Sequence, residues 1–198
     1  MASKLEWKET TTEFREGREG DLRWMVNREV IYNPETGLTV ERACIRHPGI
    51  CVIAPFADPD TIVLMRQYRY SIDGELWELP AGTLEGREVD SRVIANESPE
   101  ECAARELREE TGYSAERIEK VVECYTNPGS SDQLMHIFFA FGLRKGEQEL
   151  DEGELIRELR PFSTADLVSL IRRGEIRDAK TLIALFVALS RRPSGLQI

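Results

Sequence analysis

The stretch Glu97-Ser-Pro-Glu-Glu-Cys-Ala-Ala-Arg-Glu-Leu-Arg-Glu-Glu-Thr-Gly-Tyr113 decides the fold. Ser98 is a favourable N-cap, Pro99 suits the first helical position, and Glu101 completes a capping box. Gly112 suits the left-handed residue that commonly follows the last turn of a helix. The sequence therefore predicts a helix that begins at Pro99 and ends just before Gly112.

Three glutamates lie close together on this predicted helix. At the helical rotation per residue, Glu106, Glu109 and Glu110 fall within an arc of roughly 100°. The neighbouring arc is apolar and suits packing on a sheet (Ala103, Ala104 and Leu107). Like charges at this spacing repel each other, and clustered carboxylate oxygens are suitable ligands for Mg²⁺ or Mn²⁺. A solvated acidic face is the alternative interpretation, since many helices carry pairs of glutamates.

The spelling from Glu97 to Gly112 resembles the Nudix box, whose pattern is Gly-x5-Glu-x7-Arg-Glu-U-x-Glu-Glu-x-Gly-U, with U apolar or bulky. Every fixed position in that range is matched, and Tyr113 is acceptable at the last position. Fourteen residues separate Gly82 from Glu97, where the family pattern has five. We interpret the nine surplus residues as a loop insertion within Arg87–Ala95, which a loop tolerates because closure entropy grows slowly with length. Its place beside the presumed site makes it a candidate for shaping specificity.

Composition limits the class of protein. The 198 residues, 41% hydrophobic and 31% charged, suit a folded globular chain with one sizeable core and a small appendage. No apolar run approaches the ~20 residues of a transmembrane helix, and the first residues lack an apolar signal core, so we expect a cytoplasmic protein without a membrane partner. The net charge of −10 argues against a general nucleic-acid binder, which needs a basic surface.

Cysteine and histidine give no strong signal for a metal or a nucleophile. The four cysteines form no Cys-x-x-Cys pair and are expected to be reduced, small buried side chains (Cys44, Cys51, Cys102 and Cys124). A zinc site or a catalytic thiol is the less favoured alternative. His136 lies in an apolar strand pattern, which favours a packed cross-strand histidine over a catalyst.

The order of the expected elements predicts an α/β fold. Residues 1–20 are polar and indicate either a mobile arm or a weak first strand. Runs of β-branched and aromatic residues predict strands at 24–32, 38–45, 50–56, 61–68, 76–80, 118–125, 134–141 and 156–162. Two final helices are expected, one capped by Ser163 and ending at Gly174, the other running from Asp178 to about Arg191. This order suits a mixed sheet between helices.

The Nudix resemblance implies an α/β/α sandwich with a mixed sheet, preceded here by an N-terminal β-hairpin segment. His47-Pro-Gly49 marks the boundary, so we expect an N-terminal antiparallel segment at 1–46 and a Nudix hydrolase domain at 47–198. A lone hairpin is marginally stable, which means that this segment must dock on its own domain or on a second subunit.

Further sequences narrow the resemblance to the ADP-ribose pyrophosphatase subfamily over roughly residues 22–190. These are Pro128, 15 residues after Tyr113 within an aromatic-x-x-Pro-Gly sequence, and the segments Arg66–Arg69, Glu78–Gly82 and Asp178–Thr181. The subfamily implies homodimers whose N-terminal strands cross to the partner. It also implies Mg²⁺-dependent hydrolysis, with Mn²⁺ as a possible substitute, of ADP-ribose or a related ADP-sugar to AMP and a sugar phosphate.

Other activities remain open. A GDP-mannose or other NDP-sugar pyrophosphatase would use the same fold, because a few pocket contacts set the identity of the base. A messenger-RNA or dinucleoside polyphosphate hydrolase is a further enzyme alternative. A non-hydrolytic domain that senses a nucleotide sugar is the alternative from another class, although such domains usually lose glutamates that this chain keeps.

The resemblance assigns the metal to Glu106 and Glu110, with Glu109 sharing or bridging and the Ala81 carbonyl as a further ligand. Arg105 is expected to orient the glutamates, and Glu97 to brace the loop. The competing interpretation of Arg105 and Glu97 is that they only hold the loop to the helix.

For the substrate, the resemblance implies contacts from Arg69, Trp24, Arg42 and the Gln133 loop, although Trp24 also suits core packing at a dimer interface. The subfamily usually has a glutamate at the position of Gln133, and a neutral amide cannot take a proton as a carboxylate does. The general base is therefore left between Asp132, which also suits a simple turn residue, and Glu109. With Glu110, these are the candidate catalytic residues.

Overall fold

The computed structural model describes residues 5–18, 21–150 and 153–191. The chain divides into two compact units. The first draws on Met1–Ile50, Thr83–Ser98 and Cys124–Met135, and the second on Cys51–Gly82, Pro99–Glu123 and His136–Ile198. Each unit is described by itself below. The candidate metal ligands all fall in the second unit.

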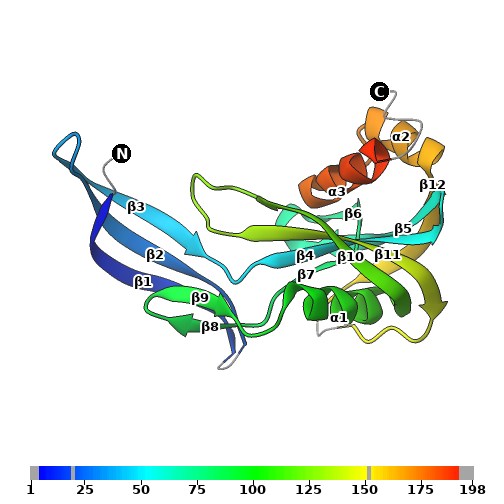
Figure 1. The fold of residues 1–198 in the computed structure, drawn as a ribbon, viewed down its shortest axis with the longest axis horizontal. Coiled ribbons are helices and arrows are strands. Elements are labelled where there is room, and N and C mark those ends of the chain that lie inside the picture. The colour runs from blue at the N-terminus through cyan, green and yellow to red at the C-terminus, as the bar shows by residue number, and fades with distance from the viewer. Residues whose placement is uncertain (1–4, 19–20, 151–152, 192–198) are drawn as a thin grey trace. The chain divides into compact units, whose positions relative to one another are not determined.

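The first unit contains a three-stranded antiparallel sheet in the order β1-β2-β3 (Figure 1). Its strands are β1 (Glu6–Arg18), β2 (Asp21–Asn33) and β3 (Leu38–Arg46). The described part of residues 1–20 thus forms a strand, and the two strands predicted at 24–32 and 38–45 are present. Between them the chain turns at 34–37, where Gly37 has a φ of 70°.

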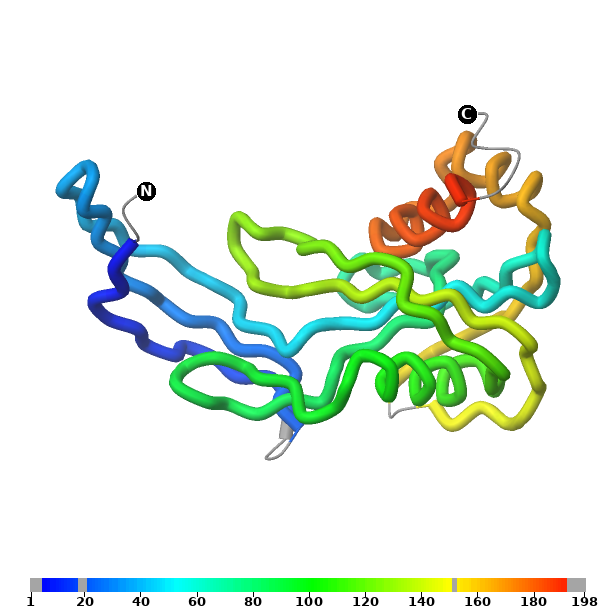
Figure 2. Tube along the Cα trace, in the orientation of Figure 1, coloured from blue at the N-terminus to red at the C-terminus, as the bar shows by residue number. Residues whose placement is uncertain are grey.

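The surplus residues after Gly82, expected as a loop insertion within Arg87–Ala95, form an ordered hairpin. The hairpin pairs β8 (Gly86–Val89) with β9 (Arg92–Ala95). Its two turn residues, Asp90 and Ser91, have φ values of 49° and 58°, as in the mirror-image turns that match strand twist. Figure 2 shows the hairpin beside β2, where Val93 is buried with Leu22 and Met25. The insertion therefore extends the first unit rather than forming a free loop.

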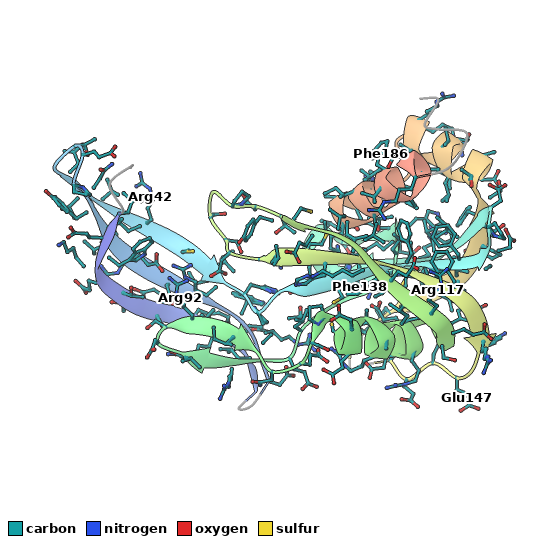
Figure 3. The ribbon with its side chains drawn as sticks, viewed as in Figure 1. Arg42, Arg92, Arg117, Phe138, Glu147 and Phe186 are labelled. Carbon is teal, nitrogen blue, oxygen red and sulfur yellow. The ribbon has the colours of Figure 1, made fainter. Side chains whose placement is uncertain are left out.

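The second unit is built on a seven-stranded mixed sheet in the order β10-β11-β4-β5-β12, with β6 paired to β5 and β7 paired to β4. The strands are β4 (Ile50–Asp58), β5 (Thr61–Arg69), β6 (Gly74–Glu78), β7 (Ala81–Thr83), β10 (Tyr113–Tyr125), β11 (Leu134–Lys145) and β12 (Ile156–Ser163). Central strands β4, β5 and β11 carry long runs of buried apolar residues, including Phe138 on β11 (Figure 3). Each predicted strand of this unit is present, with ends that differ by several residues in places.

Helices cover both faces of this sheet. Figure 1 shows α1 (Pro99–Thr111) on one face and α3 (Ala179–Ser190) on the other, with α2 (Thr164–Arg172) close to α3. A short 3-10 turn, η1 (Tyr70–Ile72), joins β5 to β6. The arrangement is the α/β/α sandwich expected from the sequence. No helix in the described ranges is long and apolar enough to cross a membrane.

The helix ends follow the sequence signals. Gly112, directly after α1, has a φ of 70° and donates its N–H to the Arg108 carbonyl at 2.8 Å. The Ser163 side chain accepts the Asp166 N–H at 3.2 Å, and Asp178 accepts the Thr181 N–H at 2.8 Å. The caps at Ser163 and Asp178 are therefore confirmed.

Candidate active site

Helix α1 turns two of its glutamates into the protein. Glu106 is 8% exposed and Glu110 only 1%, whereas Glu109 is half-buried. The expected packing arc is partly wrong, because Ala104 is exposed while Ala103 and Leu107 are buried. The acidic side of the helix is therefore not a solvated face: it is largely buried.

Burial makes the charged form of both carboxyls unfavourable. Loss of hydration raises the pKa of Glu106 to about 7, against the opposing effect of the Arg105 guanidinium. Burial first, and then the neighbouring Glu106, raise the pKa of Glu110 well above its ordinary value. The Ala81 N–H partly offsets this by donating to Glu110 Oε2 at 2.7 Å. Two carboxyls thus share a buried location that suits a cation.

Arg105 holds the glutamates from the outer side of the helix. Its Nη1 atom donates to Glu106 Oε1 at 2.6 Å and to Glu109 Oε2 at 3.2 Å. The remaining Glu109 oxygen, Oε1, accepts from Arg108 at 3.3 Å. Arg105 therefore contacts two of the three carboxylates.

Gly82 lets the Glu106 carboxyl lie directly against the backbone. A Cβ atom at residue 82 would overlap the carboxyl carbon and both oxygens of Glu106. Because Ala81 binds Glu110 through its N–H, this short segment contacts both buried carboxyls. The first glycine of the box is thus explained by a close approach of backbone and carboxylate.

Arg69 belongs to a second charged group in the same unit. Its guanidinium donates to both oxygens of the fully buried Glu78, at 2.9 and 2.7 Å. Lys180, which opens α3, lies 3.5 Å from Glu78 and 2.6 Å from Asp178. Charges on Glu110 and Asp178 also act on Arg69 and raise its pKa, after the larger effect of Glu78. Arg69 and Lys180 therefore place positive charge near the buried glutamates.

Three participants were not predicted as site residues. Glu78 and Lys180 lie in segments that already carried the subfamily resemblance, which was the available signal. Glu154, in the polar segment before β12, acts electrostatically on both Glu106 and Glu110 and raises the pKa of each. It stands 44 residues after Glu110, within a run that reads as an exposed loop, so no local pattern identifies it.

The remaining candidate site residues lie in the first unit. The Trp24 ring lies 5.4 Å from the Phe14 ring, centroid to centroid. Arg42, labelled in Figure 3, projects from β3, and its Nη1 donates to the adjacent Glu41 carbonyl at 2.9 Å. Glu97 accepts the Glu85 N–H at 2.9 Å, which fits its expected role in bracing the loop.

Asp132 and Gln133 lie in the turn between β10 and β11. Asp132 accepts from Arg46 at 2.9 Å and from the His47 N–H at 2.9 Å. Gln133 Oε1 accepts from the Thr126 hydroxyl at 2.7 Å. The second unit thus contains Ala81, Arg69, Arg105 and the three helix glutamates, and the first unit contains the other five candidates.

His136 is packed across strands as expected, whereas the expectation that all four cysteines are buried is only partly confirmed. His136 on β11 is buried, and its Nδ1 lies 3.3 Å from Glu123 on the adjacent strand β10. All four cysteines are free thiols, and two of them, Cys51 and Cys102, are buried.

The donor set fits a hard divalent cation. In the described ranges, no three acidic, histidine or cysteine side chains already converge in a metal-binding arrangement. However, Glu106 and Glu110 supply oxygen donors, both are buried, and their mutual repulsion would be relieved by a cation. Mg²⁺ commonly uses one or two carboxylates and keeps its other positions for water and phosphate oxygens. The residues present are therefore compatible with such an ion.

Comparison with known proteins identifies the family. The NUDIX domain model matches residues 45–185, so the chain belongs to the Nudix family. The chain is 34% identical over 151 residues to an ADP-ribose pyrophosphatase of Bacillus subtilis, covering 75% of this chain and 76% of the relative. It is 37% identical over 150 residues to a GDP-mannose pyrophosphatase of Cronobacter sakazakii, covering 71% and 72%. These matches make the chain a Nudix hydrolase.

A solved structure supports the fold. The crystal structure of an ADP compounds hydrolase superposes with a TM-score of 0.72 over 94% of this chain and 93% of that one, at 22% identity. The likeness includes the described N-terminal strands, because the match covers almost the whole chain.

Proposed function

We propose that this Nudix hydrolase cleaves the pyrophosphate bond of ADP-ribose or a related ADP-sugar, releasing AMP and a sugar phosphate such as ribose 5-phosphate. The observation that carries the proposal is the buried pair Glu106 and Glu110 on α1, beside Ala81 and Gly82. The 34% identity to an ADP-ribose pyrophosphatase supports the choice of substrate.

In this proposal Glu106 and Glu110 hold Mg²⁺, or Mn²⁺ in its place, with Glu109 and the Ala81 carbonyl as further ligands. Such an ion polarises phosphoryl oxygens, lowers the pKa of a bound water and offsets the charge of the substrate. Arg105 keeps Glu106 and Glu109 oriented through its two contacts. Glu97 braces the preceding loop through the Glu85 N–H.

Arg69 is assigned to the pyrophosphate or the ribose. Glu78 fixes the guanidinium in a bidentate pair, so the atoms that remain available are held in a defined orientation. Lys180 contributes a second positive charge beside Glu78. Together they favour a substrate that carries several negative charges.

The base that activates water is assigned to Glu154 or Glu109 rather than Asp132. Both oxygens of Asp132 already accept hydrogen bonds, from Arg46 and from His47. Glu154 is partly exposed and lies close enough to raise the pKa of Glu106 and Glu110. Water attack forms a new P–O bond, the bridging P–O bond breaks, and the water proton passes to this carboxylate.

The first unit is assigned to nucleotide contacts and to assembly. Trp24 and Arg42 are candidates for the adenine and the phosphates, and Gln133 for a further substrate contact. The segment 1–46 is proposed to cross to the partner in a homodimer, since β1 and β3 are sheet edges and Trp7, Phe14 and Leu38 are exposed. The free thiols suit a reducing, cytoplasmic compartment.

A second candidate is the hydrolysis of GDP-mannose or another NDP-sugar. It is supported by the 37% identity to a GDP-mannose pyrophosphatase and by Gln133, which departs from the pattern that resembles ADP-ribose pyrophosphatases. Both candidates use the same metal site and differ in the contacts to the base and sugar.

The test is a direct comparison of substrates. The purified protein is incubated with ADP-ribose, GDP-mannose and a diadenosine polyphosphate in Mg²⁺, and products are separated by ion-exchange chromatography. Fastest release of AMP and ribose 5-phosphate from ADP-ribose is the expected result. Faster release of GMP from GDP-mannose would favour the second candidate, and no turnover of any substrate would overturn both in favour of a sensing role.

A further inference from the structure

The segment 126–133, between β10 and β11, is closed by its own hydrogen bonds. The Thr126 N–H donates to the Gln133 carbonyl at 3.2 Å, and the Thr126 hydroxyl donates to Gln133 Oε1 at 2.7 Å. The N–H groups of Ser130 and Ser131 both donate to the Asn127 carbonyl, at 3.1 and 2.9 Å. These hydrogen bonds make the segment 126–133 a compact loop.

The end of β3 fixes the backbone of this loop. The Ile45 N–H donates to the Ser130 carbonyl at 2.8 Å, and the Asp132 N–H donates to the Ile45 carbonyl at 3.2 Å. Ile45 and Ser131 form an isolated parallel bridge. Both of these backbone hydrogen bonds involve Ile45, so the backbone link between β3 and the loop is limited to a single residue of β3.

A buried ion-pair cluster adds to this link. The side chains of Arg46, Glu29 and Asp132 are 9%, 4% and 32% exposed. The Arg46 guanidinium donates from Nε to Glu29 Oε1 at 3.1 Å and from Nη1 to Asp132 Oδ2 at 2.9 Å, and its Nη2 also pairs with Glu29. One arginine thus joins a carboxylate of β2 to a carboxylate of the loop.

Both ends of this cluster are fixed. Glu29 Oε2 accepts from Trp7 Nε1 at 2.9 Å, so both Glu29 oxygens are engaged and the guanidinium orientation is set. At the loop end, the His47 N–H donates to Asp132 Oδ1 at 2.9 Å. Two consecutive residues, Arg46 and His47, therefore hold the two oxygens of Asp132, in the geometry of a clamp rather than of a proton acceptor.

We propose that Arg46 is a positioning residue that clamps the 126–133 loop through Asp132, with Glu29 as its buried counter-charge, and that this clamp sets the affinity for the nucleotide sugar. The effect on affinity rests on the proposed function, which assigns Gln133 of this loop to the substrate. The clamp itself rests only on the contacts within the first unit.

The test combines hydrogen exchange of the loop with steady-state kinetics, on the full chain. Asp132→Asn keeps the side-chain shape and an acceptor for the His47 N–H but removes the charge that Arg46 binds. Arg46→Lys keeps the charge but loses the fork that reaches two carboxylates, and Arg46→Met removes both. Glu116→Gln is the matched control, because it removes a carboxylate from an exposed arginine pair, with Arg144 at 2.7 Å.

Asp132→Asn is expected to speed amide exchange in 126–133 and raise KM by about tenfold with little change in kcat, since lost positioning weakens binding rather than chemistry. Arg46→Lys should lie between the wild type and Arg46→Met. The control should match the wild type in both measurements. If Arg46→Met fails to fold, Asp132→Asn and Arg46→Lys still decide the matter.

Unchanged exchange and KM in Asp132→Asn would overturn the clamp. A loss of kcat at constant KM would also overturn it, because that result places Asp132 in the chemical step. If the wild type turns over no nucleotide sugar, the proposed function fails by itself. Faster exchange of 126–133 in the variants would then still establish the clamp, and unchanged exchange would refute it.

Discussion

Each unit of this protein contains a buried group of carboxylates, and the two groups are balanced differently. In the first unit, Arg46 lies between Glu29 and Asp132, and every carboxylate oxygen of Glu29 has a donor. In the second unit, Glu106 shares Arg105 with Glu109, while Glu110 receives a single backbone N–H from Ala81. Glu29 therefore has a direct ion-pair partner, whereas Glu110 has none among the described residues.

The difference teaches how to separate a structural from a functional buried charge. Glu29 is 3% exposed and Glu110 is 1% exposed, so burial alone does not distinguish them. Removing one partner of a compensated buried pair is destabilising, whereas an uncompensated buried carboxylate is a liability that persists where function requires it. The same substitution, glutamate to glutamine, should therefore change the free energy of unfolding in opposite directions at Glu29 and at Glu110.

The largest effect is expected from Glu110→Gln on turnover. The amide keeps the size of the side chain but removes charge from the proposed metal site, so kcat should fall by at least about a thousandfold, the scale seen when a main electrostatic stabiliser is lost. Activity is measured with saturating substrate and excess Mg²⁺. Turnover near the wild-type value under these conditions would contradict the metal assignment.

The next effect is a pH dependence of stability in the metal-free protein. Glu106 has a pKa of about 7 when folded and an ordinary value of 4.5 when unfolded. Between these two pH values the folded protein holds a proton on Glu106 that the unfolded chain has lost. The contribution of Glu106 to stability is therefore fully present below pH 4.5 and is lost as the pH rises through about 7. The change should amount to about 3 kcal/mol.

Urea unfolding in EDTA between pH 5 and pH 8 measures this change, and Glu106→Gln provides the control that lacks the titrating group. The wild type should lose stability relative to the variant as the pH rises, and added Mg²⁺ should restore more stability at pH 8 than at pH 5. Parallel pH profiles for the two proteins would rule out the proposed titration of Glu106.

A smaller effect is expected on the free energy of unfolding at pH 8 without metal, where Glu110→Gln and Glu29→Gln should change stability with opposite signs. Glu110→Gln should raise the free energy of unfolding, because the amide replaces a carboxyl whose ionised form is disfavoured by burial. Glu29→Gln should lower it by roughly 2 kcal/mol, because the Arg46 guanidinium loses a charged acceptor. Chemical denaturation of the two variants side by side gives both signs, and equal signs would break the comparison.

The smallest effect is expected from Gly82→Ala. The added methyl group would displace the Glu106 carboxyl from the backbone, while Glu106 is flexible enough to move with little loss of stability. Affinity for Mn²⁺ should fall by about tenfold, equivalent to ~1.4 kcal/mol, with a melting temperature close to that of the wild type. Calorimetric titration with Mn²⁺ measures it, and unchanged affinity would mean that the position of Glu106 does not matter for the metal.

Much of the fold was predictable because its signals are local. The proline, the caps and the glycine placed α1 and both C-terminal helices correctly, and runs of β-branched and aromatic residues located most of the strands. The β8–β9 hairpin was not recognised, because its Asp90-Ser91 turn lacks the Asn-Gly or Asp-Gly spelling that marks such turns most clearly. Val93 then becomes buried only through contact with Leu22 and Met25, about seventy residues earlier in the chain.

The sequence indicates candidate ligands for the site but not their environment. The box spelling identified Glu106, Glu109 and Glu110, yet the helix alone does not indicate which of them is buried. That depends on Ala81 and Gly82, which approach from another segment. The electrostatic effect of Glu154 on Glu110 and the hydrogen bond from Arg46 to Asp132 likewise depend on segments that are distant in the chain, which one sequence does not reveal.

The most direct test of the central claim is a titration with Mn²⁺ followed by electron paramagnetic resonance of the free ion, in the wild type, Glu110→Gln and Glu29→Gln. We predict that the wild type and Glu29→Gln bind Mn²⁺ alike, and that Glu110→Gln binds at least about tenfold more weakly. Equal binding by all three proteins would contradict the claim that the buried pair Glu106 and Glu110 is the metal site.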